Sequence, residues 1–286
     1  MISADLHTHS TSSDGLLSPT QLLCSAEEKK IKYYSISDHN TCDAYTKLPK
    51  DISKLYSGKL IPGVEISTTY NGTFIEVLAY NFDIDIMDEE LKDLFYSDKL
   101  EQRFLFDHYY RIIRKHELKC NFINVDDMTD VTNSFYKELI KYKSNKKYLK
   151  DIHNVTEFAR KGVYNPKSIF FVDFSDIHPD LDTVLNIIHK AKGKAFLAHV
   201  FKYSNINIYK ELNNIILTNY DGHKFDGIEA IHASFTQDQT NFLIDYAQKN
   251  NLLISGGSDS HGIIGGYELG CKVLPSCKQT NWIINI

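Results

Sequence analysis

Residues 1–15 read MISADLHTHSTSSDG, a short apolar run that leads into His7 and His9 and, five residues later, Asp14. The run predicts a β-strand that ends in a polar loop. Because side chains at positions i and i+2 of a strand point the same way, the two imidazoles should project together from the strand end. Neutral imidazole is the commonest metal ligand, so the pair predicts either part of a metal site or simply a polar strand end.

Further short apolar runs recur along the chain, and helical patterns separate them. The runs are YYSIS (33–37), KLIPGVEIS (59–67), FIEVLAY (74–80), KAFLAHV (194–200), FDGIEAI (225–231) and NLLISGGSDSH (251–261). The helical patterns are SPTQLLCSAEEKK (18–30), DLDTVLNIIHKAKG (180–193) and TQDQTNFLIDYAQKNN (236–251). In the first of these, Ser18 followed by Pro19 is typical of a helix N-terminus. Alternating strands and helices predict βα units that form a parallel sheet or a barrel.

Residues 87–175 interrupt this alternation, because they are mostly helical in pattern and rather polar. DEELKDLFYSDKLEQRFLFDHYYRIIRKHEL (88–118) is a candidate for a long amphipathic helix, and KELIKYKSNKKYLK (137–150) is strongly basic with tyrosines between the lysines. We therefore expect one barrel domain over residues 1–286, with an inserted helical subdomain at about 87–175. The lysine-rich stretch is either a solvated helix face or a clamp for substrate over the mouth of the barrel.

Composition restricts the class of protein. The chain has 286 residues, 42% of them hydrophobic, and a formal net charge of −5, so no strong basic field is available to wrap a long duplex. Its five cysteines are odd in number and lack C-x-x-C spacing, which argues against a disulfide framework and for a reducing compartment. No run approaches about 18 apolar residues, and the N-terminus lacks an apolar signal segment. We expect a cytoplasmic protein without membrane contact or an obligate protein partner.

Nine residues of metal-binding type stand at or near the carboxyl ends of the apolar runs. They are His7, His9, Asp14, His39, Glu65, Glu76, His199, Asp259 and His261. In a (β/α) barrel that end of the strands forms the active-site face, so the nine side chains predict a site for divalent metal ions. His232 closes the run FDGIEAIH and is ambiguous. We expect the other histidines at the surface; they are His108, His116, His153, His178, His189 and His223.

Five motifs, in this order and spacing, resemble those of one known family. DLHTHSTSSDG, SISDHNT, GVEIS, FLAHV and GGSDSHG are similar to the motifs of the polymerase and histidinol phosphatase (PHP) family of metal-dependent phosphoesterases. The resemblance covers roughly residues 1–85 and 180–275. The helical stretch between these two ranges lies outside the five motifs. It resembles the variable insert of family members that cleave nucleotides and oligonucleotides. The resemblance implies a distorted (β/α)7 TIM-like barrel with two or three divalent ions.

The resemblance also implies how the ions share their ligands. The set that resembles the ligands of one ion is His7, His9, Glu65 and Asp259. The set that resembles the ligands of a third ion is Asp14, His39 and His261. Glu65 would bridge to a second ion that His199 also binds. Glu76 departs from the family, which usually has histidine there, and as a harder ligand it should favour Mn²⁺, Mg²⁺ or Fe²⁺ over Zn²⁺. Asp5 and Asp38 are expected to orient the ligand imidazoles.

Hydrolysis of a phosphate ester needs hydroxide near neutral pH and neutralisation of charge on the phosphoryl oxygens. Metal ions supply both, since coordination lowers the pKa of water from 15.7 to about 7. Lys202 and Arg160 are candidates for binding the substrate phosphate. Asp259 would take part in catalysis by binding a metal ion. His232 would either donate a proton to the leaving group as general acid or only cap a strand.

Four functions are open on the sequence alone. The leading prediction is an enzyme that hydrolyses the phosphate ester of a small metabolite or nucleotide by metal-activated water, with Mn, Fe, Zn or Mg as the ion. A second is a 5′-end exonuclease or nucleoside 3′,5′-bisphosphate phosphatase, in which the basic helical stretch would hold the backbone of a short oligonucleotide. Histidinol phosphatase and a non-catalytic metal-binding regulatory protein are the other two. The large ligand set favours an enzyme, because binding alone would not need an open site for several ions.

Overall fold

The strands form two sheets in the computed structural model, which describes residues 2–95, 98–121, 130–203, 206–262, 267–270 and 274–285. The first sheet is parallel, in the order β1 (Ala4–Asp5), β2 (Tyr33–Tyr34) and β3 (Lys59–Leu60). The second has the order β4 (Gly63–Tyr70), β5 (Thr73–Tyr80), β6 (Lys194–Leu197), β7 (Gly227–His232) and β8 (Leu253–Gly257). The prediction of an α/β fold with parallel strands is therefore confirmed.

A β-hairpin interrupts the parallel order of the second sheet. β5 is antiparallel to both β4 and β6, whereas β6, β7 and β8 run parallel. Asn71 and Gly72 connect β4 to β5, and their positive φ angles of 48° and 73° suit a tight turn between twisted antiparallel strands. Because the strands of the described residues hydrogen-bond as two separate sheets, the closed barrel that the sequence predicted is not confirmed.

The first sheet nevertheless meets both edge strands of the second, β8 and β4. The Leu6 amide, just after β1, donates to the Gly256 carbonyl of β8 at 3.1 Å. The Asn40 amide, which follows β2, donates to the Glu65 carbonyl of β4 at 2.9 Å. As a result, the segments that follow β1, β2 and β8 gather beside β4, and the polar residues that they carry lie close together.

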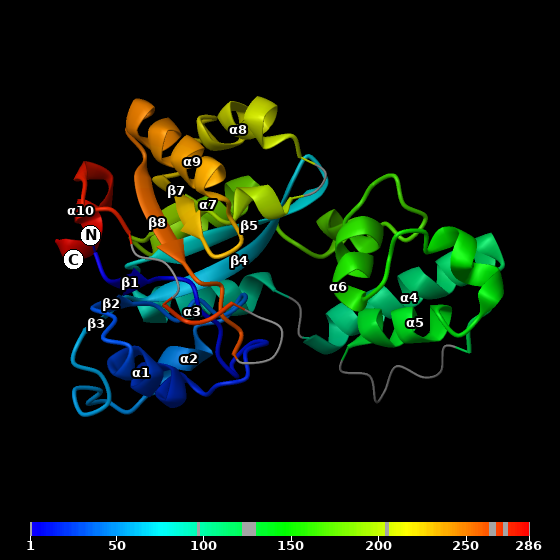
Figure 1. Cartoon of the computed structure of the whole chain (residues 1–286), viewed down its shortest axis with the longest axis horizontal. Helices are drawn as coiled ribbons and strands as arrows, with labels where there is room; N and C mark the ends of the chain where they lie inside the picture. The colour runs from blue at the N-terminus through cyan, green and yellow to red at the C-terminus, as the bar shows by residue number, and fades with distance from the viewer. Residues whose placement is uncertain are drawn as a thin grey trace.

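Helices lie above and below the strands in the view of Figure 1. The sheet-containing body has α1 (Pro19–Glu28), α2 (Asp43–Lys47), α3 (Ile84–Leu94), α7 (Leu181–Lys190), α8 (Ile208–Ile216), α9 (Gln237–Lys249), α10 (Asn281–Ile284) and the short turns η5 (Val200–Lys202) and η6 (Lys278–Thr280). Ser18 caps α1, because its hydroxyl accepts from the Gln21 amide at 3.3 Å and Pro19 is the first helical residue. No helix in the described ranges is long and apolar enough to span a membrane.

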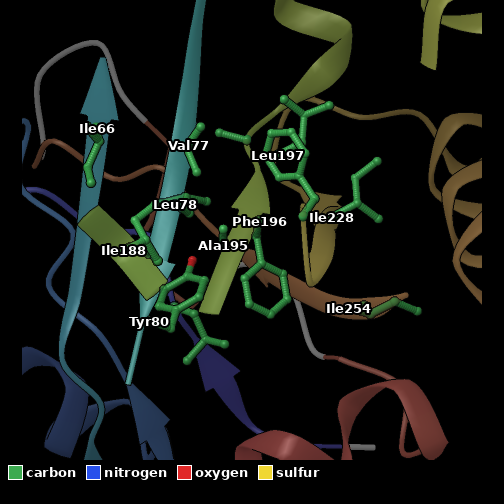
Figure 2. Close-up of a cluster of buried hydrophobic side chains, with 14 of the residues drawn as sticks. Ile66, Val77, Leu78, Tyr80, Ile188, Ala195, Phe196, Leu197, Ile228 and Ile254 are labelled. Carbon is green, nitrogen blue, oxygen red and sulfur yellow. The ribbon is translucent and has the colours of Figure 1, made fainter. Parts of the chain in front are cut away.

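The largest hydrophobic core lies on the second sheet, and Figure 2 shows side chains from β4 to β8 converging there. Val77, Leu78, Phe196 and Ile228 are fully buried in it, together with Ile188 of α7. Burying one side chain of this size stabilises the fold by about 1.5–3 kcal/mol. The packed core thus fixes the positions of the strand ends that carry the polar residues.

A helical unit lies beside this body (Figure 1). It comprises α4 (Asp98–His116), α5 (Val131–Leu139), η2 (Lys143–Tyr148), α6 (Val155–Phe158), η3 (Ala159–Val163) and η4 (Phe174–Asp176). Tyr109, Phe135 and Phe170 belong to a second hydrophobic cluster, in which the Tyr109 and Phe135 rings stack at 4.3 Å. Met87 and Leu91 of α3 pack instead in the core of the body. The division of the chain into a domain and an insert stays a prediction.

His178 is buried, so the prediction that it lies at the surface is wrong. Only 8% of the residue is exposed, and its ring lies 5.3 Å from that of Phe174 and 5.5 Å from that of Phe74. Phe174 belongs to the helical unit and Phe74 to β5, so His178 packs where the two parts meet. Its Nδ1 atom makes no hydrogen bond within the described part of the chain, and burial lowers the pKa of His178 to about 4.

We expect His178 to make stability depend on pH. Because its pKa is about 6.5 in the unfolded chain, the unfolded state binds a proton between about pH 6.5 and 4 that the folded state does not bind. Stability should be full above that range and fall by roughly 3 kcal/mol as the pH drops through it. Urea unfolding of the wild type and of His178→Phe across this range tests the point. The wild type should lose stability relative to the variant at low pH. A difference in unfolding free energy between the two proteins that stays constant with pH would contradict the prediction.

Candidate metal centre

The first candidate group of ligands lies just beyond β1. His7, His9, Glu65 and Asp259 are buried, and each offers a ligand atom within 4.8 Å of the others. Glu65 Oε2 is 3.1 Å from His7 Nε2 and 3.4 Å from His9 Nε2, which also lies 3.3 Å from Asp259 Oδ1. The Asp259 amide donates to the His7 carbonyl at 2.8 Å, and this bond joins the segments that follow β8 and β1.

The second candidate group is more open to solvent. It consists of His9, Asp14, His39 and His261. Asp14 Oδ2 is 3.2 Å from His261 Nε2 and 3.7 Å from His39 Nε2, and the Asp14 side chain is 55% exposed. Gly15 lets the loop fold back onto the strand, since a Cβ at this position would lie 2.1 Å from the His9 carbonyl oxygen.

The third candidate group includes the unusual Glu76. Glu65, Glu76 and His39 offer ligand atoms to one point, and His199 Nε2 lies 2.7 Å from Glu65 Oε1 and 3.3 Å from Glu76 Oε2. Glu76 pairs with Ser67, two residues along β4 from Glu65, so both carboxylates leave the same face of the hairpin. The structure thus brings all nine predicted ligands together, while their binding of metal stays a prediction.

Lys202 and His232 both contact Asp259. Lys202 Nζ is 2.6 Å from Asp259 Oδ2, and His232 Nε2 is 3.3 Å from the same oxygen. His232 is fully buried, and its Nδ1 lies 2.7 Å from Ser234 Oγ. This geometry suits a group that positions Asp259, and the general-acid role of His232 stays a prediction. Arg160, the other predicted phosphate ligand, lies in η3 and lines a cavity beside Lys202.

Glu229 belongs to the site, and the sequence analysis missed it. Its Oε1 lies 3.0 Å from His7 Nδ1, and its Oε2 accepts from the His199 amide at 2.8 Å. When the proton of neutral His7 is on Nδ1 and forms a hydrogen bond to Glu229, the lone pair of Nε2 faces Glu65 and is available to a metal. The available signal was a carboxylate in the middle of the apolar strand GIEAIH, because a buried charge needs a partner.

Asp5 and Asp38 hold loops rather than imidazoles, which corrects the sequence prediction. Asp5 accepts from the Ser258 amide at 2.8 Å and from its hydroxyl at 2.7 Å. Asp38 accepts from the Ser10 amide and hydroxyl, both at 2.6 Å. These bonds fix the backbone next to ligands on both the β1 and the β8 side of the site.

The donor set fits divalent cations. Ligand atoms that each lie about 2.1 Å from one ion are about 3.0–3.4 Å apart, which is the spacing of the His9, Glu65 and Asp259 atoms. The His9 ring is fully buried, yet neither of its nitrogens meets hydrogen-bond geometry with a described residue. Such a buried polar group is costly unless something binds it, and a metal ion would satisfy it.

Charge in the cluster also favours a cation. Burial alone would lower the pKa of His9, but its contacts with Asp259 and Glu65 raise that pKa to about 9. Burial raises the pKa of Glu65, whereas the imidazoles of His7 and His199 hold it well below its ordinary value. Protons on the His7 and His9 imidazoles, whose pKa values are both raised, thus balance part of the carboxylate charge. Because metal ligands bind in their deprotonated forms, a divalent ion can replace those protons.

Two cavities lie over the ligands, between the body and the helical unit. Their volumes are about 660 and 500 Å³. Both are lined by His39 and Glu76 of the site and by Phe74 and Tyr164, whose rings stack at 5.1 Å. Since Phe74 comes from β5 and Tyr164 from beside η3, the two parts of the molecule enclose the site together.

Comparison with known proteins agrees with this geometry. The PHP domain family matches residues 5–237. A 5′-3′ exoribonuclease of Haemophilus influenzae is 28% identical over 272 residues, 93% of this chain and 92% of its own. The 5′-3′ exoribonuclease Rnm of Salmonella typhimurium is 27% identical over 289 residues, 97% of this chain and 92% of its own. The structure of a protein described as a metal-dependent phosphoesterase, from Bifidobacterium adolescentis, matches with a TM-score of 0.66 at 18% identity, covering 99% of this chain and 95% of its own.

Fold, ligand cluster and relatives together define a hydrolase that acts on phosphoester bonds. The chain belongs to the PHP domain family. The family and the reaction class that the sequence motifs predicted are both confirmed.

Proposed function

We propose that this enzyme is a 5′-3′ exoribonuclease, which removes nucleotides from the 5′ end of RNA. Its relatives of that name align over more than nine-tenths of both chains, which favours the exonuclease alternative over a phosphatase for small metabolites. The observation that carries the proposal is the pair of cavities, because both reach the same ligands. A terminal nucleotide can occupy one side while the chain continues on the other.

The three ligand groups would hold two or three divalent ions, with Glu65 shared between two groups. Such ions supply hydroxide near neutral pH and neutralise charge on the phosphoryl oxygens. With two carboxylates beside His199, the position of the second ion should prefer Mn²⁺, Mg²⁺ or Fe²⁺ to Zn²⁺.

Lys202 and Arg160 would bind the phosphate at the cleaved bond, since both line the smaller cavity. Burial acts to lower the pKa of Lys202, but the carboxylates of Asp259 and Glu76 raise it above its ordinary value. Lys202 therefore stays cationic at neutral pH and can pair with a phosphoryl oxygen. The helical unit, which we propose is an insert in a single domain, would cover the bound chain.

Digestion of a short RNA tests the proposal. A 12-nucleotide RNA with a 5′ phosphate and a 3′ fluorescent label should shorten stepwise from its 5′ end when the enzyme is supplied with Mn²⁺. Excess chelator should stop the reaction, and renewed Mn²⁺ should restore it. Histidinol phosphate and a nucleoside 3′,5′-bisphosphate serve as comparison substrates. Efficient cleavage of either one, together with an intact 12-mer, would show that the enzyme is a phosphatase.

A further inference from the structure

The outer end of the helical unit carries a dense group of cations that the catalytic site does not use. The outer basic patch consists of Arg114, Lys115, Lys119, Lys143, Lys146 and Lys147, all of them exposed. Within the described ranges, none of the six forms an ion pair with a carboxylate. The chain as a whole has a net charge of −5, so this concentration of positive charge runs against its overall composition.

Packing joins the two halves of the patch into one surface. The His116 ring at the end of α4 meets the Tyr148 ring of η2 at 6.0 Å. The buried Asn145 side chain accepts from the Lys119 amide at 3.1 Å and donates to the Lys119 carbonyl at 2.7 Å. The arrangement is therefore fixed. Holding like charges together costs free energy by mutual repulsion, and a polyanion would relieve that repulsion.

α4 links this patch to the catalytic cavities. Gln102, near the start of α4, lines the larger cavity, and Lys115 lies 13 residues further along the same helix. At 1.5 Å per residue the two are about 20 Å apart along the axis. About six stacked nucleotides span that distance at 3.4 Å each. A chain whose 5′ end occupies the site can therefore reach the patch with its downstream phosphates.

We propose that the outer basic patch binds the backbone of single-stranded RNA downstream of the cleaved end and so makes the enzyme favour longer chains. The proposal rests on the exoribonuclease function. Contacts from lysine and arginine to phosphates carry no sequence information, so the preference should depend on length rather than on sequence. Lys147 Nζ lies 4.7 Å from the centre of the Tyr148 ring. An aromatic face therefore lies beside the cations, as in other surfaces that bind single-stranded nucleic acid.

A series of RNA lengths tests the proposal on the Mn²⁺-loaded enzyme. The patch variant is Lys143→Glu/Lys146→Glu/Lys147→Glu, and the matched control is Lys50→Glu/Lys54→Glu/Lys210→Glu, at exposed lysines elsewhere. The substrates are 5′-phosphorylated oligoadenylates of 2, 4, 8 and 12 nucleotides. For the wild type and the control, KM should fall by about tenfold between 4 and 12 nucleotides, whereas the patch variant should lose this gain. All three proteins should cleave the dinucleotide equally well.

The salt dependence of binding gives a second readout. With chelator present to keep the 12-mer intact, removing three cationic contacts should make the slope of log K against log salt shallower by about 2. If the enzyme degrades no RNA, the proposed function is wrong. The role of the patch in RNA binding is then still tested, by comparing how tightly the wild type and the patch variant bind the 12-mer. A wild-type KM that does not change with length, or equal losses in the patch and control variants, would overturn it. Unchanged 12-mer binding by the patch variant would leave a solvated face or a protein contact as the role of the patch.

Discussion

Replacing Asp259 with asparagine is expected to lower the rate of phosphoester hydrolysis by at least about 100-fold, because losing groups that merely orient a ligand already costs about 10–100-fold. Asp259 Oδ1 faces His9 at 3.3 Å, and Oδ2 faces Lys202 at 2.6 Å. Asparagine keeps the shape of the side chain but removes the charge. It also tolerates the φ angle of 54° at this position, so the backbone should stay in place.

The measurement is kcat/KM on the 5′-phosphorylated RNA, with bound metal quantified in the same preparations. The exposed His153 offers a matched control, since His153→Ala changes a residue of ligand type far from the cluster in the sequence and should leave the rate unchanged. Urea unfolding would show that both variants fold. Near-normal turnover by Asp259→Asn with a full complement of metal would remove Asp259 from the proposed ligand set.

The ligand cluster was accessible from sequence because its signals are local. His7 and His9 are two residues apart just beyond β1, and Asp259 and His261 follow another apolar run in the same way. Residue type and position at a strand end are enough to predict such a site. The rule that strand ends meet at one edge then brings the separate motifs together.

The arrangement of the sheets was harder to predict, because it depends on pairing between distant segments. Asn71-Gly72 is a strong hairpin signal, and once β5 runs antiparallel to both neighbours the simple alternation of βα units is broken. Burial is equally non-local. His178 directly precedes a proline, which is typical of an exposed loop, yet the rings of Phe74 and Phe174 enclose it.

Glu229 shows why partners of ligands escape a sequence search. Its side chain lies in the middle of β7, so no strand-end rule points to it, and its role depends on His7, more than 200 residues away. Only the packing of β7 near the end of β1 makes that carboxylate useful. Asp5 and Asp38 show the opposite case. They lie near candidate ligands in the sequence, but in the structure their side chains accept hydrogen bonds from serines.

Changing Glu229 to glutamine should weaken metal binding and raise the Mn²⁺ concentration for half-maximal activity by about 10–100-fold. One amide oxygen cannot replace both carboxylate oxygens, which now serve His7 Nδ1 at 3.0 Å and the His199 amide at 2.8 Å. The amide NH₂ would face a donor on one of these two sides. Burial raises the pKa of Glu229, but the imidazoles of His7 and His232 hold it below its ordinary value, so the wild-type side chain is charged.

Titration of activity with Mn²⁺ separates this orienting role from a purely structural one. If Glu229 acts through the ligands, saturating Mn²⁺ should restore most of kcat in Glu229→Gln, because the ions themselves can still bind. A variant that has merely lost part of its fold would show low kcat at every Mn²⁺ concentration and a lower midpoint of unfolding. Glu211→Gln on α8 is the matched control, since it removes the charge of a half-buried glutamate outside the site and should leave the Mn²⁺ titration unchanged. An unshifted half-saturation point in Glu229→Gln would mean that His7 keeps its orientation without the carboxylate.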